Sequence, residues 1–219
     1  MKIICITGMD GAGKTTLARR IVAQLREKGQ PCAYVYGRTY PLVSRLLMAL
    51  GRAAFLRKQD IWEDFKEYET SKKQVMRSPI LTWIYTAAIL FDYYLQIWLK
   101  LAIHFFSRRT IVLDRYIYDT VISDLSVHLG YSPQDTLGAI ERGLKLLPRP
   151  ALTILIDLPE EVAFERKDDV PHLDYLRQRR KTYLLLENSP GVTRLDGSQA
   201  ADSLLEQSMA ARRSTALPE

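Results

Sequence analysis

The sequence predicts an α/β fold with a five-stranded parallel sheet and helices on both of its faces. Two observations predict this fold. Short apolar runs without polar alternation recur along the 219 residues, as expected for strands that are buried on both faces. Segments with helical periodicity separate these runs, and that order favours parallel pairing through crossover helices.

The first strand, helix and second strand lie within residues 2–36. Lys2–Thr7 is an apolar strand pattern that leads directly into a glycine-containing loop. Lys14–Lys28 has apolar residues at helical spacing, and Gly29 is suited to end this helix. Cys32–Tyr36 has the β-rich composition of a second strand.

Three further strands are expected after a helical middle segment. Residues 41–107 show helical periods, and buried strands are predicted at 110–113, 152–156 and 192–195, before a last helix at 199–213. Ligands of parallel α/β sheets bind beyond the carboxyl ends of the strands. The residues at those ends are Gly8, Gly37-Arg38, Asp114-Arg115, Asp157 and Asp196-Gly197.

Gly8-Met9-Asp10-Gly11-Ala12-Gly13-Lys14-Thr15 matches the pattern G-x-x-x-x-G-K-[ST], between a predicted strand and a predicted helix. The loop backbone and the helix N-terminus would hold a polyphosphate. Lys14 would reach the β- and γ-phosphates, and the Thr15 hydroxyl would bind Mg²⁺. The motif therefore predicts a P-loop NTPase. Its nucleotide-binding residues would be Gly8, Asp10, Gly11, Ala12, Gly13, Lys14, Thr15 and Thr16.

Length and composition indicate one domain over residues 1–213, followed by a frayed tail at 214–219. The net charge is +6, but no segment concentrates Lys and Arg as a nucleic-acid-binding arm does, so small-molecule nucleotides are the expected partners. Two cysteines without metal-ligand spacing and an N-terminus without a signal-peptide pattern predict a cytoplasmic protein.

Ser78–Phe91 carries no charge, and apolar residues continue to Phe106. The uncharged run is too short to span a bilayer, and Asp92 interrupts the apolar segment. We therefore expect no transmembrane segment and a helix that is buried on most of its circumference. Peripheral membrane contact, aided by the basic stretch Leu42–Lys58, is the less favoured alternative.

Three segments together, ITGMDGAGKTT, LDRY and PALTILIDLPEEVAFERK, resemble the thymidylate kinase family of nucleoside monophosphate kinases in order and spacing. The resemblance extends over roughly Lys2–Arg213 and is tightest at the phosphate loop and at Asp114-Arg115-Tyr116. It implies ATP as phosphoryl donor, Mg²⁺ as cofactor and, by analogy, dTMP as acceptor.

The resemblance also implies roles for individual residues. Asp10 would bind a sugar hydroxyl, although an aspartate can simply stabilise a turn there. Asp114 would bind Mg²⁺ with Thr15, and Arg115 would hold the acceptor phosphate, unless the two form a structural pair. Residues 160–181 would form a lid, with Arg166 as the first candidate to stabilise the transferring phosphoryl group. Arg177, Arg179 and Arg180 are alternatives, and a solvated helix face is the non-functional interpretation.

The acceptor region departs from the family pattern. Gly37-Arg38-Thr39-Tyr40-Pro41 replaces the segment after the second strand, where Arg38 can still bind phosphate. Tyr93 stands about where the family has an arginine. A kinase of a nucleoside or another metabolite therefore stays open, as does a regulatory ATPase. A homodimer also stays open.

Overall fold

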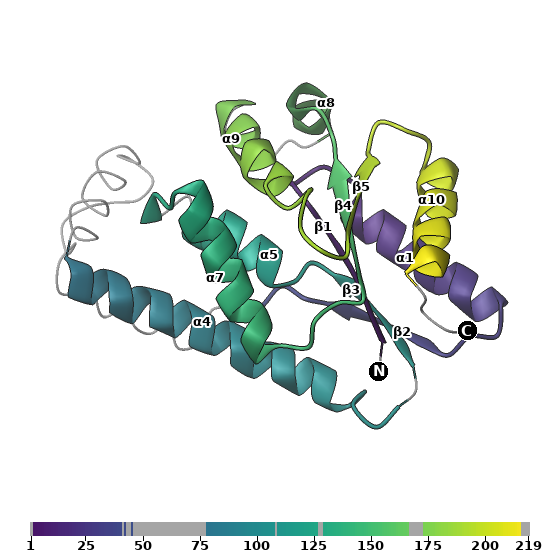
Figure 1. The fold of residues 1–219 in the computed structure, drawn as a ribbon, viewed down its shortest axis with the longest axis horizontal. Coiled ribbons are helices and arrows are strands. Elements are labelled where there is room, and N and C mark those ends of the chain that lie inside the picture. Colours follow the sequence, from purple (N-terminus) through teal and green to yellow (C-terminus); the bar gives the residue numbers. More distant parts are fainter. Residues whose placement is uncertain are drawn as a thin grey trace. The chain divides into compact units, whose positions relative to one another are not determined.

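The computed structural model describes residues 2–40, 42, 45, 78–107, 109–126, 129–166 and 173–215. Five strands form one parallel sheet in the order β2-β3-β1-β4-β5 (Figure 1). The strands are β1 (Lys2–Gly8), β2 (Cys32–Tyr36), β3 (Thr110–Asp114), β4 (Leu152–Asp157) and β5 (Val192–Asp196). The predicted fold class is confirmed, and this topology is consistent with a P-loop kinase fold.

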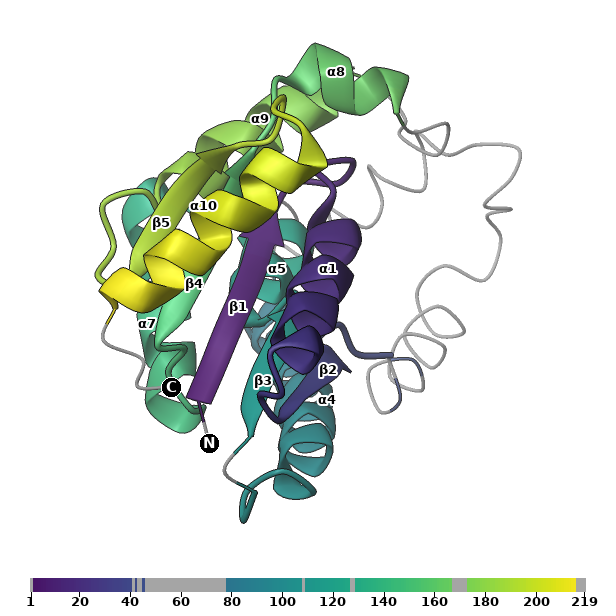
Figure 2. The ribbon, with the colours of Figure 1, turned by 90° about the vertical axis from the view of Figure 1, so that its right-hand side faces the viewer.

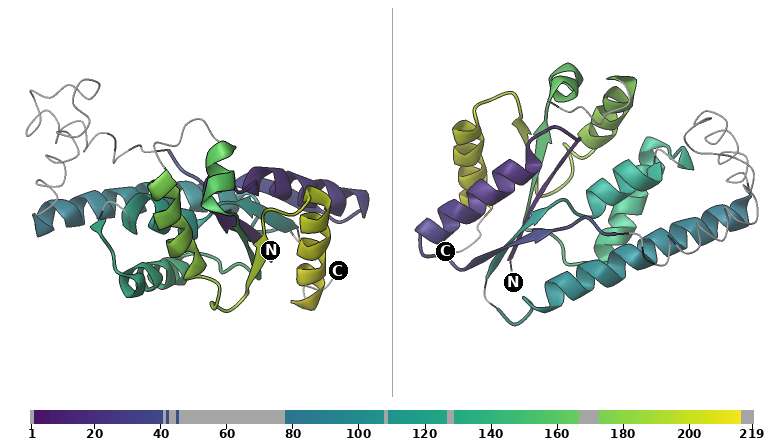
Figure 3. Two further views of the ribbon diagram at one scale, coloured as in Figure 1. Left: turned by 90° about the horizontal axis from the view of Figure 1, so that it is seen from above. Right: turned by 180° about the vertical axis from the view of Figure 1, so that it is seen from behind.

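Helices cover both faces of the sheet. On one face α1 (Lys14–Glu27) packs against the strands and against α10 (Ala201–Ser214) (Figure 2). The other face carries α5 (Ile117–Asp119), the π-helix η1 (Thr120–Ser126), α7 (Pro133–Leu146) and α9 (Leu173–Leu184) (Figure 3). The short helix α8 (Glu160–Glu165) follows β4 and contacts α9.

The position of each strand in the sheet decides how deeply it is buried. Every residue of β3 and β4 is buried, as are all residues of β1 after Lys2. β2 and β5 lie at the two edges and are only partly buried. The expectation that all five strands are apolar on both faces is therefore wrong for β5, where Arg194 is exposed.

The chain divides into two compact units, one formed by Met1–Arg38 with Lys100–Glu219 and the other by Thr39–Leu99. The first unit contains the whole sheet and the phosphate loop. A single folding domain over 1–213 stays a prediction. α10 extends the last predicted helix to Ser214, and residues 216–219 of the expected tail lie outside the described residues.

The second unit contains most of α4 (Pro79–Ala102). The structure does not describe residues 41, 43, 44 and 46–77, which precede this helix. Most of the basic stretch 42–58 is among them. Within this unit the backbone N–H of Leu42 donates to Asp92 Oδ2 at 2.9 Å, and Gln96 exchanges two hydrogen bonds with the backbone of Tyr40. One side of α4 therefore carries polar groups that bind the preceding loop.

The expectation that this helix is buried on most of its circumference is wrong. Only 22% of its most apolar 18-residue window is buried, and large apolar side chains along it are exposed. At 24 residues it is long and apolar enough to cross a membrane, a criterion that some core helices of soluble proteins also meet. The length argument from Ser78–Phe91 therefore does not hold, whereas the absence of a transmembrane segment stays a prediction.

Candidate nucleotide-binding site

The phosphate loop connects β1 to α1 and leaves backbone N–H groups available for an anion. Gly13 occupies the N-cap of α1 with φ 89°, a left-handed conformation that favours glycine, and no described side chain caps this end of the helix. The first N–H groups of a helix have no acceptor within it. Thr16 is exposed in this first turn, whereas Ala12 is buried. The helix N-terminus can therefore receive phosphate oxygens.

Lys14 is almost completely buried and lies across the loop. Its Nζ donates to the carbonyl oxygens of Gly8 at 2.6 Å and Met9 at 2.8 Å, and it lies 3.9 Å from Asp10 Oδ1 and 4.0 Å from Asp119 Oδ1. Burial lowers the pKa of Lys14 to about 8, against the opposing effect of these carboxylates. The ammonium group is held in the loop, where it can exchange carbonyl partners for phosphate oxygens.

Thr15 and Asp114 lie together beside the loop and fit a magnesium ion. Thr15 Oγ1 donates to Asp114 Oδ2 at 2.6 Å, and the Tyr34 hydroxyl donates to the same oxygen at 2.7 Å. The other oxygen, Oδ1, is buried and accepts no hydrogen bond from any residue that the structure describes. Mg²⁺ takes few protein oxygens and completes its shell with water and phosphate. A hydroxyl and an unsatisfied carboxylate oxygen suit that chemistry.

No group of three or more His, Cys, Asp and Glu residues that could hold a metal occurs among the described residues. Such a group characterises metal sites built entirely from protein ligands, whereas magnesium in phosphoryl-transfer sites is bound by one or two carboxylates together with substrate phosphates. The donor set at Thr15 and Asp114 is therefore of the kind that binds a metal with its nucleotide.

Arg115 joins the end of β3 to the phosphate loop. Its Nη2 donates to Asp10 Oδ1 at 2.9 Å, and its Nη1 lies 3.8 Å from Asp119 Oδ1. Burial by itself would raise the pKa of Asp10, but Lys14 and Arg115 outweigh it and lower the pKa to about 2. Asp10 is therefore an ionised partner of two cations, and its contact with a sugar hydroxyl stays a prediction.

The backbone at Arg115 depends on Gly37. Arg115 has φ 72°, a left-handed conformation that is strained for a residue with a side chain. A Cβ on Gly37 would lie 1.9 Å from the Arg115 carbonyl oxygen, so only glycine allows this approach. The Gly37 N–H also donates to the Asp114 carbonyl oxygen at 2.9 Å. The loop after β2 thus helps to set the position of the Arg115 guanidinium.

Asp119 is a buried carboxylate that connects several elements of the first unit. Its Oδ2 accepts from Thr7 Oγ1 at 2.9 Å and from the Tyr116 N–H at 3.2 Å, and its Oδ1 accepts from the Tyr183 hydroxyl at 3.0 Å. Burial raises the pKa of Asp119, and Lys14 and Arg115 offset only part of that effect. The carboxylate links α9, through Tyr183, to β1 directly before the phosphate loop.

The four lid arginines differ in their surroundings. Arg180 binds Asp157 with two hydrogen bonds of 2.7 and 3.0 Å, and Arg177 pairs with Glu160. Arg179 is nearly buried, donates to the Ser123 carbonyl oxygen and contributes to the low pKa of Asp10. Arg166, the first candidate from the sequence, is exposed at the end of α8. Residues 167–172 of the predicted lid lie outside the described residues.

The chain is similar to one protein-family model and to several known proteins. A family model described as "Nephrocystin 3, N-terminal" matches residues 1–82, the segment that contains the phosphate loop. "Probable thymidylate kinase 1" of Saccharolobus solfataricus is 27% identical over 219 residues, covering 95% of each chain. "Probable thymidylate kinase" of Archaeoglobus fulgidus is 26% identical over 94% of this chain and 91% of its own. "Thymidylate kinase" of Xanthomonas campestris is 26% identical over 95% and 81%.

The chain is a distant full-length homologue of thymidylate kinases. This finding confirms the resemblance drawn from the three sequence segments. At 26–27% identity, homology suggests a nucleotide kinase and leaves the acceptor open.

The predicted site residues of the first unit come together to different extents. Asp10, Lys14 and Arg115 form one ionic cluster, and Thr15 contacts Asp114. Further predicted residues have other surroundings: Arg38 pairs with Asp124 at 3.2 Å, and Tyr93 is buried on α4, in the other unit. Their roles stay predictions.

Sequence reasoning missed Asp119, Tyr34 and Tyr183. A carboxylate five residues after Asp114, within the otherwise buried stretch of α5 and η1, was the available signal for Asp119. Tyr34 and Tyr183 carried no comparable signal, because hydroxyl contacts between distant segments depend on the fold.

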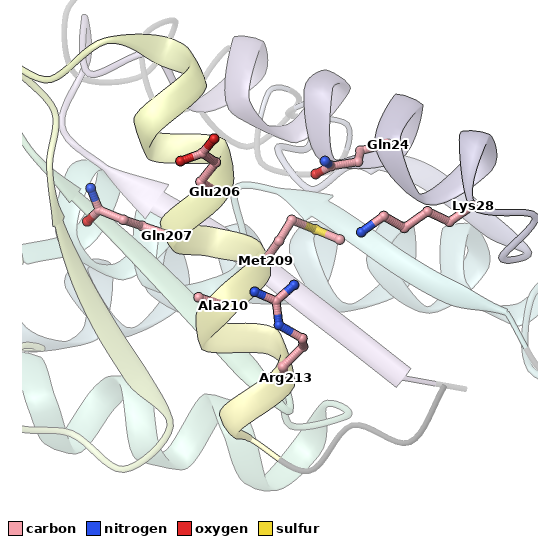
Figure 4. A pocket seen from close by; sticks show the side chains of 7 residues that line it. All are labelled: Gln24, Lys28, Glu206, Gln207, Met209, Ala210 and Arg213. Carbon is pink, nitrogen blue, oxygen red and sulfur yellow. The ribbon is translucent and has the colours of Figure 1, made fainter.

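A hollow between α1 and α10 is separate from this site. Figure 4 shows Gln24 and Lys28 of α1 opposite Glu206, Met209 and Arg213 of α10. Gln24 lies ten residues after Lys14, which is roughly 15 Å along a helix. The hollow therefore lies toward the far end of α1 from the phosphate loop.

Proposed function

We propose that the protein transfers the γ-phosphoryl group of Mg·ATP to a nucleoside monophosphate, with dTMP as the first acceptor to test. The arrangement at the carboxyl ends of β1 and β3 carries the proposal: a glycine-rich phosphate loop, a buried lysine across it, and the Thr15–Asp114 contact beside it. The full-length relatives are named as thymidylate kinases, which supports dTMP as acceptor.

In this reaction the protein positions the reactants and neutralises charge, which suffices for phosphoryl transfer without a strong general base. The loop N–H groups and Lys14 would bind the β- and γ-phosphates. Thr15 and Asp114 would hold Mg²⁺, which supplies positive charge to the phosphate oxygens when it is bound.

Arg115 would bind the acceptor phosphate, with Arg38 as a second cation in the same unit. Each arginine already has a carboxylate partner, Asp10 or Asp124. A bound phosphate dianion would therefore replace these carboxylates as the partner of arginines that are already oriented. Asp10 would then be available to accept a hydrogen bond from a sugar hydroxyl.

The test measures ADP formation from Mg·ATP with dTMP, the other nucleoside monophosphates and nucleosides. Acceptor-stimulated turnover with dTMP supports the proposal, and stimulation by another compound alone reassigns the acceptor. ATP hydrolysis that no acceptor stimulates would contradict a kinase. Lys14→Ala is the control, because a contaminating kinase would be unaffected by it.

The same assay compares two lid arginines. Arg166→Ala should lower kcat if Arg166 closes over the triphosphate, because charge-neutralising arginines are worth about 10³–10⁵ in rate in related reactions. Arg179 already contributes to the low pKa of Asp10, so Arg179→Ala is the matched variant. A larger loss for Arg179→Ala would transfer the predicted role to that residue.

A further inference from the structure

A single carboxylate oxygen lies beside both cations of the proposed site. Asp119 Oδ1 is 4.0 Å from Lys14 Nζ and 3.8 Å from Arg115 Nη1. In the proposed reaction Lys14 binds the triphosphate and Arg115 binds the acceptor phosphate, so the two cations serve different substrates. Asp119 is buried, and charges attract each other more strongly where water is excluded. The carboxylate is therefore placed to fix the two cations relative to each other.

Neutral donors from three parts of the fold hold this carboxylate. Thr7 Oγ1 near the end of β1 and the Tyr116 N–H before α5 donate to Oδ2 at 2.9 and 3.2 Å. The Tyr183 hydroxyl of α9 donates to Oδ1 at 3.0 Å. All three hydrogen bonds are donated to Asp119, as an ionised carboxylate requires, because it can only accept. The negative charge therefore has a fixed position beside the phosphate loop.

A carboxylate in this place does not help to bind anions. The phosphates of both substrates are negative and would be repelled by it, and burying its charge is costly. Lys14 and Arg115 also repel each other, since Arg115 contributes to the low pKa of Lys14. A carboxylate that attracts both cations offsets this repulsion. The benefit of Asp119 therefore lies in the orientation of the cations and not in substrate affinity.

Asp10 contacts the same two cations but has a second role in the proposed reaction. Its Oδ1 lies 3.9 Å from Lys14 Nζ and 2.9 Å from Arg115 Nη2. When a phosphate binds Arg115, Asp10 would turn to a sugar hydroxyl. Asp119 is held by the three donors named above. It is therefore the carboxylate that stays with both cations when the substrates are bound.

We propose that Asp119 is a positioning residue for phosphoryl transfer: its carboxylate holds the Lys14 ammonium and the Arg115 guanidinium in the relative placement that brings the two substrates into line. Asp119 acts through these cations and touches neither substrate. The inference rests on the proposed function, because it takes Arg115 as the residue that binds the acceptor phosphate. The competing explanation is that Asp119 only joins β1 to α5 and α9.

Two variants separate these explanations. Asp119→Asn removes the charge but keeps the size of the side chain and an oxygen that can accept hydrogen bonds. Thr7→Val removes one hydrogen bond of the carboxylate and leaves its charge, which Tyr116 and Tyr183 still hold. Both are compared with the wild type in kcat, with the acceptor that gives the highest turnover, and in Mg·ATP affinity by calorimetry.

Asp119→Asn should lower kcat by about 10- to 100-fold, because misplaced reactants lose rate steeply. It should bind Mg·ATP within about threefold of the wild type, because Asp119 does not attract the phosphates. Thr7→Val should lower the unfolding midpoint by about 2–4 °C and keep kcat within about threefold. If Asp119→Asn does not fold, Asp119→Ser removes the same charge, leaves a hydroxyl, and should show the same separation of kcat from affinity.

Two results would overturn the positioning role alone. One is a wild type that acceptors stimulate together with an equally active Asp119→Asn. The other is an equal loss of kcat in Asp119→Asn and Thr7→Val, accompanied by weaker Mg·ATP binding in both, because a loosened fold would then explain the loss. A wild type that no acceptor stimulates would instead refute the proposed function, and the positioning role with it.

Discussion

Replacing Gly37 by alanine tests whether the backbone after β2 holds Arg115 in its position. The new Cβ would lie 1.9 Å from the Arg115 carbonyl oxygen and 2.8 Å from its carbonyl carbon. Both are backbone atoms, so no side-chain rotation relieves the overlap. The backbone segments at Gly37 and at Arg115 must move apart, although Gly37 and Asp114 are joined there by a backbone hydrogen bond.

The cost follows from the contacts that such a separation would break. The Gly37–Asp114 hydrogen bond contributes about 1 kcal/mol, and the charged hydrogen bond between Arg115 and Asp10 about 2 kcal/mol. We therefore expect the free energy of unfolding to fall by about 3 kcal/mol. For a chain of 219 residues this corresponds to a decrease of roughly 6–12 °C in the unfolding midpoint. Phosphotransfer should fall as well, because Arg115 moves.

Urea unfolding of Gly37→Ala and Gly29→Ala provides the measurement and its control. Gly29 has φ 68° with no atom within 4 Å of its Cβ position, so alanine there costs only the left-handed conformation, about 1 kcal/mol. The difference between the two variants isolates the overlap at Gly37. Equal stability of the two variants would refute the close approach, and a fully active Gly37→Ala would refute its role in positioning Arg115.

Two further predictions concern the carboxylates of Asp10 and Asp119. The pKa of Asp10 is lowered from 3.8 to about 2, so its ionised form stabilises the fold above about pH 4, and this contribution is lost as the pH falls toward 2. Asp10→Asn should therefore lower the free energy of unfolding in urea by about 2 kcal/mol at pH 7 and by less at pH 3. An equal loss at both pH values would contradict the ion pair. Tyr183→Phe leaves Asp119 Oδ1 without its hydroxyl donor and should lower the free energy of unfolding by about 1–3 kcal/mol. The control Tyr36→Phe, on the edge strand, should lower it by less than about 0.5 kcal/mol. Similar losses for the two variants would argue against the buried hydrogen bond between Tyr183 and Asp119.

Much of the fold could be predicted because its signals are local. Cys32–Tyr36 was predicted with its observed bounds, and the other strands extend one residue further at their carboxyl ends. Gly29 ends α1 as expected, with its N–H bonded to the Arg26 carbonyl oxygen and a left-handed backbone. Apolar runs, periodicity and helix-ending residues act over a few positions and therefore survive in the sequence.

The site was predictable only where its residues are contiguous or end a strand. The phosphate loop is a single segment, and Asp114 and Arg115 follow a strand whose end borders it. Asp119 contacts Thr7 across 112 positions, and nothing local indicates which side chain a buried carboxylate will meet. The order of strands in the sheet decides that contact.

The sequence by itself determined the phosphate loop and the parallel α/β architecture, because both follow from short-range constraints on backbone conformation and apolar patterning. Only the tertiary structure decided which lid arginine contributes to the low pKa of Asp10, that Gly37 touches Arg115, and which side chains of α4 remain exposed. Each of these depends on which surfaces pack together, and hydrophobic composition specifies that a side chain prefers burial without specifying its partner.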